Sequence, residues 1–83
     1  MAEKGIGVVS DYFAKIEVAA IKLNGGLKIG DKILFKGATS DFKQTVKSMQ
    51  INRKPVEKAG ANDEIGIKVK DRVRRNDRVF LVE

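Results

Sequence analysis

The side chains in this sequence that could do chemistry are mainly basic, and most of them gather toward the C-terminal end. The first basic group comprises Lys68, Lys70, Arg72, Arg74, Arg75 and Arg78. Ammonium and guanidinium groups at this density neutralise phosphates and release their counterions. The group therefore predicts a patch that binds polyanions. The alternative interpretation is a solvated surface whose charge is offset by Glu64, Asp71 and Asp77.

A second basic group surrounds the single proline, Pro55. It comprises Arg53, Lys54 and Lys58, with Glu57 as the nearby acid. Both groups contribute to the excess of 17 basic over 11 acidic residues, a formal net charge of +6. If the fold brings the two groups side by side, they form one continuous patch, and the spacing along the chain leaves this question open.

Aromatic side chains indicate which polyanion such a patch would favour. Proteins that bind single-stranded nucleic acid stack bases on exposed rings, at ~1–3 kcal/mol per base. Phe35 and Phe42 fall at predicted core positions, which leaves Tyr12, Phe13 and Phe80. Tyr12 and Phe13 also fit a structural role, in which they cover the open end of a barrel. Structured RNA, contacted through its backbone, is therefore the expected partner.

The sequence excludes most catalytic chemistry. It has no cysteine and no histidine, so thiol nucleophiles, imidazole bases and the common zinc ligands are absent. Paired carboxylates would have to converge in a pocket, whereas the acidic residues here fall in turns or on charged faces. We therefore predict no catalytic residues, no cofactor and no metal, and expect that the protein is not an enzyme.

Length and patterning predict one small domain. The 83 residues allow a single core, which we place in residues 5–83 after a short polar tail at residues 1–4. A membrane span needs ~20 apolar residues, and no run here approaches that length. We expect a cytoplasmic protein with no membrane partner.

Period-two alternation predicts an all-β fold. Short runs in which apolar and polar residues alternate cover residues 5–10, 31–36, 64–70 and 78–82, separated by Gly, Asn and Asp turns. In the run at 64–70 the residues Ile65, Ile67 and Val69 face inward, and we expect residues 78–82 as its cross-strand partner. The predicted architecture is a small closed or partly open antiparallel barrel of six to seven strands.

Two further runs are less regular. Residues 14–21 fit a strand but also the i, i+3, i+4, i+7 spacing of an amphipathic helix, and the turn Asn24-Gly25-Gly26 favours the strand. In residues 42–51 the alternation changes side, since Met49 and Ile51 share the face of Lys43 and Lys47. A β-bulge within one long strand would explain that change.

Residues 46–79, VKSMQINRKPVEKAGANDEIGIKVKDRVRRNDRV, resemble the second half of domain two of translation GTPases. Residues 26–33, GLKIGDKI, are similar to the entry into its third strand. The Gly-Asp turns of that family are here Asn62-Asp63 and Asn76-Asp77, and asparagine is the residue best able to replace glycine at a positive φ. The phosphate loop of a GTPase is absent, so GTP binding is not carried over.

This resemblance implies a binding module that associates with ribosomal or transfer RNA through the two basic groups. The alternative is a protein-interaction or accessory domain that docks Leu34, Phe80 and Val82 onto a larger partner. A similar barrel is found at the C-terminus of other proteins, including certain collagenase-like peptidases. Fold alone does not decide between these roles.

Overall fold

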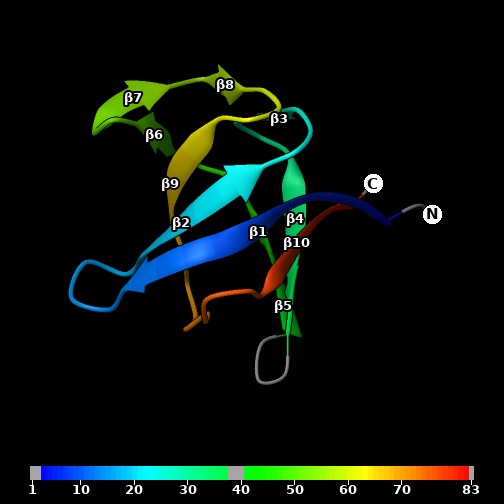
Figure 1. The fold of residues 1–83 in the computed structure, drawn as a ribbon, viewed down its shortest axis with the longest axis vertical. Helices are drawn as coiled ribbons and strands as arrows, with labels where there is room; N and C mark the ends of the chain where they lie inside the picture. The colour runs from blue at the N-terminus through cyan, green and yellow to red at the C-terminus, as the bar shows by residue number, and fades with distance from the viewer. Residues whose placement is uncertain (1–2, 38–40, 83) are drawn as a thin grey trace.

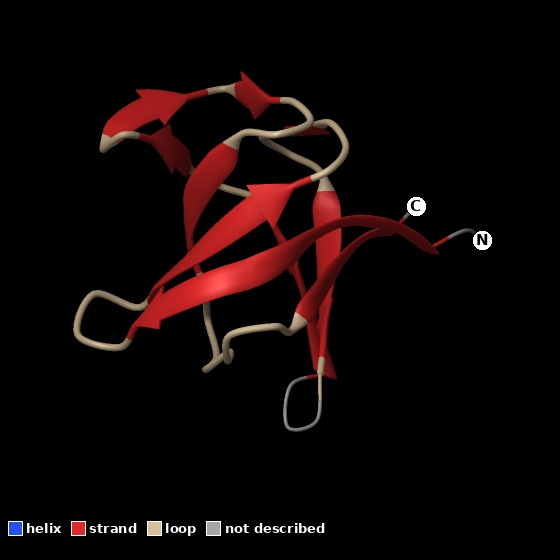
Figure 2. Cartoon of the chain, in the orientation of Figure 1, coloured by secondary structure: helices blue, strands red, loops and turns tan. Residues whose placement is uncertain are grey.

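The computed structural model describes residues 3–37 and 41–82, and in this part of the chain every regular element is a β-strand (Figures 1 and 2). The strands are β1 (Glu3–Phe13), β2 (Val18–Leu23), β3 (Leu27–Lys28), β4 (Lys32–Lys36), β5 (Asp41–Thr45), β6 (Met49–Ile51), β7 (Lys54–Val56), β8 (Lys58–Ala59), β9 (Glu64–Lys68) and β10 (Arg78–Val82). The predicted all-β class is confirmed. Residues 3 and 4, expected in a polar tail, belong to β1.

Eight strands form one antiparallel sheet in the order β5-β4-β10-β1-β2-β9-β6-β7, and β3 pairs with β8 in a small second sheet. The large sheet is open, because β5 and β7 are its two edges among the described residues. A closed barrel is therefore not found. The β7 edge carries Pro55, which lacks an N–H and blocks further strand pairing.

The core lies on the inner face of the coiled sheet. Ile65, Ile67 and Val69 are all buried there, as their alternation predicts. Phe35 is fully buried and stacks on half-buried Phe42, with ring centroids 5.0 Å apart. The two phenylalanines are thus core residues, as expected from the sequence.

Three turns of one design link the strands. Each has a positive φ at its third residue and an aspartate at its fourth. The third residues are Gly30, Asn62 and Asn76, with φ of 97°, 73° and 77°. In the second turn the Asp63 N–H donates to the Gly60 carbonyl (3.1 Å), and the Asp63 carboxylate accepts from the Gly60 N–H (2.9 Å). The turns at Asp31 and Asp77 repeat both bonds. The predicted equivalence of asparagine and glycine in these turns is confirmed.

The predicted pairing of residues 64–70 with residues 78–82 is wrong. β9 pairs with β2 and β6, whereas β10 pairs with β1 and β4. The reason is that residues 69–77 lead the chain away from β9 to the far side of β1 instead of turning back on it (Figure 1). Alternation identifies the buried face of a strand, but it carries no information about the neighbouring strand.

The run at 42–51 is two strands and not one bulged strand. β5 ends at Thr45 and β6 begins at Met49. Between them the Val46 N–H donates to the Asp31 carbonyl (2.8 Å), and the Val46 carbonyl accepts from the Gly30 N–H (2.8 Å). Register shifts occur instead in β1, between Gly5 and Gly7 and again between Val9 and Asp11.

The ambiguous run at 14–21 contributes to a strand, since β2 covers Val18–Leu23 with Ala19 and Ile21 buried. The sequence also favours a hairpin loop at the polar residues 38–41, of which residues 38–40 lie outside the described part of the chain. Among residues 3–37 and 41–82, no helix has the length and apolar character that crossing a membrane requires.

Candidate functional site

The nine basic residues predicted as a binding patch are all exposed. They do not merge. Arg53, Lys54 and Lys58 lie at the β6–β7 hairpin and on β8, at one end of the molecule, whereas the loop that carries Arg72, Arg74 and Arg75 lies at the other end (Figure 1). Arg78 begins β10 and faces outward. The sequence left the union of the two groups open, and the fold separates them.

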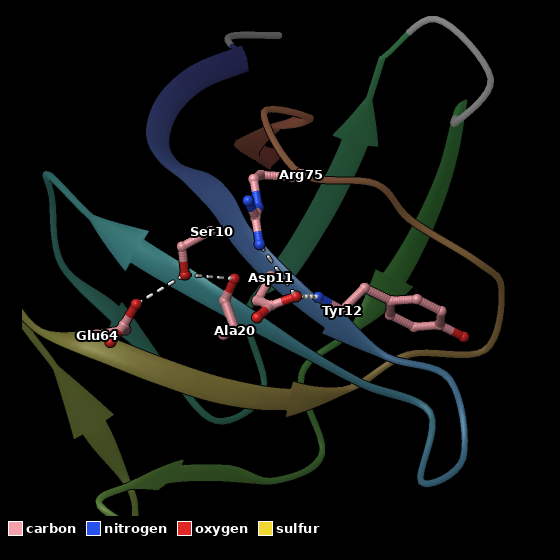
Figure 3. Close-up of polar contacts among 6 residues, drawn as sticks. All are labelled: Ser10, Asp11, Tyr12, Ala20, Glu64 and Arg75. Carbon is pink, nitrogen blue, oxygen red and sulfur yellow. Dashed lines mark hydrogen bonds and ion pairs between the residues drawn. The ribbon is translucent and has the colours of Figure 1, made fainter.

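The loop that carries Arg72, Arg74 and Arg75 contacts β1 (Figure 3). The guanidinium of Arg75 lies 3.8 Å from Asp11 Oδ1, which also accepts the Tyr12 N–H at 2.8 Å. Both ion-pair partners are well exposed, so the pair contributes little, about 0.2–1 kcal/mol. Val73 is buried and anchors the same loop through its side chain. These contacts give the loop a structural role in addition to its charge.

A second set of bonds in Figure 3 ties β1 to its neighbours. The Ser10 hydroxyl lies 2.7 Å from Glu64 Oε2 and 3.2 Å from the Ala20 carbonyl oxygen, and the two acceptors share its single hydrogen. Ser10 lies between Val9 and Asp11, where the register of β1 shifts, and β-bulges of this kind re-aim side chains. Ser10, β2 and β9 are thereby joined on the outer face.

Lys68 and Lys70, by contrast, line a groove with residues from β4, β5 and the segment after β5. The groove has a volume of about 650 Å³ and is lined by Lys32, Lys43, Gln44, Thr45, Lys47, Ser48, Lys68, Val69 and Lys70. We call this feature the lysine groove. Its volume is within the ~300–1,000 Å³ typical of ligand sites.

Gln44 fixes the two walls of the groove to each other. Its Nε2 donates to the Lys68 carbonyl at 2.9 Å, and its Oε1 accepts from the Lys70 N–H at 3.1 Å. A primary amide has both a carbonyl acceptor and an NH₂ donor, so its side chain can make the same pair of bonds that a peptide group makes. Gln44 therefore takes the place of a strand neighbour across the gap between β5 and the segment after β9.

The lysine groove is strongly positive. Its five lysines are exposed, and within the described residues none of them forms an ion pair and none of the lining side chains is a carboxylate. Lys32 and Lys43 are diagonal neighbours on paired strands, because Lys32 opposes Thr45 and Leu34 opposes Lys43. Like charges in such positions repel each other. An anion in the groove would relieve that repulsion.

Sequence reasoning found Lys68 and Lys70 but missed Lys32, Lys43 and Lys47. A signal was present, since the runs at 31–36 and 42–51 each place their lysines on one side. That pattern is equally typical of a solvated outer face, and only the approach of β5 to the segment after β9 makes it a site.

The residues predicted to dock a partner are less accessible than expected. Leu34 is only 3% exposed although it lies outside the main core, and Phe80 opposite it on β10 is half-buried, as is Val82. Tyr12 packs partly against the core, as its structural interpretation requires, while Phe13 is 48% exposed at the end of β1.

No cluster of acidic side chains within residues 3–37 and 41–82 is arranged to hold a metal ion. The chemistry that the geometry offers is therefore electrostatic attraction of an anion by the lysine groove.

Comparison with known proteins relates the chain to peptidases. No protein-family model matches it. It is 46% identical over 79 residues to an uncharacterized protease of Methanocaldococcus jannaschii, a match that covers 94% of this chain and 19% of the relative. It is 34% identical over 77 residues to a collagenase of Porphyromonas gingivalis, covering 90% of this chain and 21% of the relative. The chain thus spans about a fifth of the length of these curated relatives.

The fold is that of a solved domain from the same group. The C-terminal domain of a Geobacillus thermoleovorans protein assigned to the U32 peptidases superposes with a TM-score of 0.90. The sequences are 17% identical, and the match covers 96% of this chain and 93% of that domain. At this identity the likeness concerns the fold.

These findings overturn three predictions. The resemblance to domain two of translation GTPases is wrong, since the relatives and the solved neighbour point to the C-terminal domain of U32 peptidases and collagenases. The description as a translation-factor-like, RNA-binding protein conflicts with the same relatives. The expectation that the protein is not an enzyme is also contradicted, because the relatives are named as a protease and collagenases. The resemblance rested largely on turn motifs, which form here through local contacts and do not by themselves identify a family.

Proposed function

We propose that this chain acts as an accessory domain of a U32-type peptidase and holds polypeptide substrate for it. The observation that carries the proposal is the match to an M. jannaschii protease, at 46% identity over almost the whole chain. The matched segment accounts for about a fifth of that protease, which is a suitable size for one binding domain within a larger enzyme.

The geometry supports a role in binding. The lysine groove is partly open to solvent, so a segment of a longer chain can reach it. The unpaired side of β5 offers backbone groups to an extended peptide, and peptides commonly bind by adding to such an edge. A domain of this kind raises the local concentration of substrate for the catalytic part to which it is attached.

A domain exchange in the P. gingivalis collagenase tests this role. The segment that matches this chain is either replaced by a flexible linker or exchanged for this chain, and collagen cleavage is measured over a range of substrate concentrations. We expect the linker variant to raise KM about tenfold with kcat within about twofold, because uniform binding is lost. The exchanged domain should restore at least half of the lost kcat/KM.

Two results would contradict the proposal. In one, the linker variant keeps its full kcat/KM. In the other, the exchanged domain is folded by circular dichroism but restores nothing. A graft in which the order of this chain's residues is scrambled serves as the matched control, since it has the same length and net charge.

A further inference from the structure

The lysine groove draws its charge from separate parts of the chain. Lys32 comes from β4 and Lys43 from β5, Lys47 follows β5, and Lys68 and Lys70 lie at the end of β9 and just after it. Lysines on a merely solvated surface are usually interspersed with acids. Here the described lining side chains include no acid, and the fold holds five cations around one volume of about 650 Å³. Such an arrangement lowers stability unless an anion compensates it.

The type of cation indicates the type of anion. The described lining contains lysine but no arginine, so it meets anions as separate point charges and lacks the planar fork that grips a carboxylate or phosphate in a bidentate manner. It also contains no aromatic ring on which a base could stack. Lysine acts as a point charge on a flexible stem, which suits separate carboxylates along a chain.

The spacing of the lysines fits an extended polypeptide. Alternate side chains of an extended strand project from one face about 6.6–6.8 Å apart. Lys68 and Lys70 are two residues apart, both exposed, with buried Val69 between them, so they project from one face at about this spacing. A chain with carboxylates at alternate positions would therefore meet these two lysines while its backbone lies along the β5 edge, beside Lys43.

We infer that the lysine groove binds an extended acidic segment of a polypeptide, with Asp or Glu at alternate positions. The inference rests on the proposed function and names the class of substrate sequence that the domain would hold. Lys43, Lys68 and Lys70 contact the carboxylates, and Gln44 joins the two walls through its two hydrogen bonds.

Fluorescence anisotropy with the 83-residue chain provides the test. The probes are a labelled peptide of about ten residues in which Glu and Thr alternate, the same peptide with Gln in place of Glu, and a labelled RNA hairpin. We expect the Glu peptide to bind at least tenfold more tightly than the Gln peptide. Its affinity should fall as salt rises, since the contacts are ionic.

Matched variants locate the site. K43Q/K68Q/K70Q removes three charges from the groove, whereas R53Q/K54Q/K58Q removes three from the β6–β7 hairpin and β8, where none of the three residues lines the groove. Loss of three weak charge pairs should reduce the affinity for the Glu peptide about tenfold, and the control variant should change it by less than twofold. Because the groove lysines repel one another, K43Q/K68Q/K70Q should also unfold at the same or a higher temperature in low salt.

Three outcomes would overturn the inference. In the first, the Glu and Gln peptides bind equally. In the second, both variants lose the same affinity, which indicates a response to net charge alone. In the third, the RNA hairpin binds more tightly than the Glu peptide and its binding depends on Lys43, Lys68 and Lys70. The exchange in the collagenase is read separately. If that exchange restores cleavage while the Glu peptide fails to bind, the accessory role stands and the acidic preference falls. If the Glu peptide binds but the exchange restores no cleavage, the acidic preference stands and the accessory role falls.

Discussion

Gly37 and Asp77 form a contact that makes glycine necessary at the end of β4. A Cβ at position 37 would overlap the Asp77 carboxylate, with Asp77 Cγ only 2.5 Å away. Asp77 is 6% exposed, and its Oδ2 accepts the Arg74 N–H at 2.9 Å. The carboxylate cannot move aside without losing that bond, which holds the turn before β10.

The change Gly37→Ala should therefore lower the free energy of unfolding by up to about 2.6 kcal/mol. Overpacking costs about 1–3 kcal/mol. Gly37 is not among the described residues with a positive φ, so the alanine backbone is allowed and returns about 0.4–1 kcal/mol of chain entropy. In an Asp77→Ala background the overlap is absent, and Gly37→Ala should be stabilising by that entropic amount. The expected coupling between the two positions is about 1–3 kcal/mol.

Urea denaturation followed by far-ultraviolet circular dichroism measures all four members of this cycle, with the free energy extrapolated linearly to water. Gly60→Ala is the control, because a Cβ at position 60 meets nothing within 4 Å. It should stabilise the protein by about 0.4–1 kcal/mol. An equal cost of Gly37→Ala in both backgrounds would refute the reasoning, as would a loss of stability in Gly60→Ala.

Two further predictions concern the turns and the groove walls. Asn62→Gly and Asn76→Gly should leave the free energy of unfolding within about 0.5 kcal/mol of its original value, while alanine at either position should cost about 1–2 kcal/mol, because φ is 73° and 77° there. Thermal unfolding measures these changes, and equal effects of Gly and Ala would contradict the prediction. Gln44→Ala removes the acceptor of the exposed Lys70 N–H and should cost about 0.5–1.5 kcal/mol. Amide exchange at Lys70 should quicken at least tenfold, and unchanged protection would show that the bond is unimportant.

Local rules predicted the parts of the fold that depend on single strands and turns. The alternation of Ile65, Ile67 and Val69 identified a buried face, and the aspartates after Asn62 and Asn76 identified turns that need a positive φ. These features arise within four to seven residues, where sterics and hydrogen bonds act directly. The pairing of β9 with β2 and β6 arises from contacts far apart in sequence, and no local pattern encodes it.

The candidate site was only partly predictable for the same reason. Lys68 and Lys70 stood out because arginines follow them closely, and the density of charge drew attention to that stretch. Three of those arginines lie on a loop that Arg75 ties to Asp11, away from the lysines that complete the groove. The clustering of charged residues along a chain therefore does not show which charged side chains come together in the fold.

The open edge of the sheet and the lysine groove are one feature. Paired strands lie about 4.7–4.9 Å apart, so a full ladder between β5 and the segment after β9 would leave no space between them. One side chain, Gln44, makes two bonds across this gap instead, to Lys68 and Lys70. Backbone pairing across this gap would replace the groove with ladder hydrogen bonds and would bring the lysines of both walls closer together, which their repulsion disfavours. An open groove and a paired edge are therefore mutually exclusive arrangements of the same residues, and the cluster of like charges favours the open one.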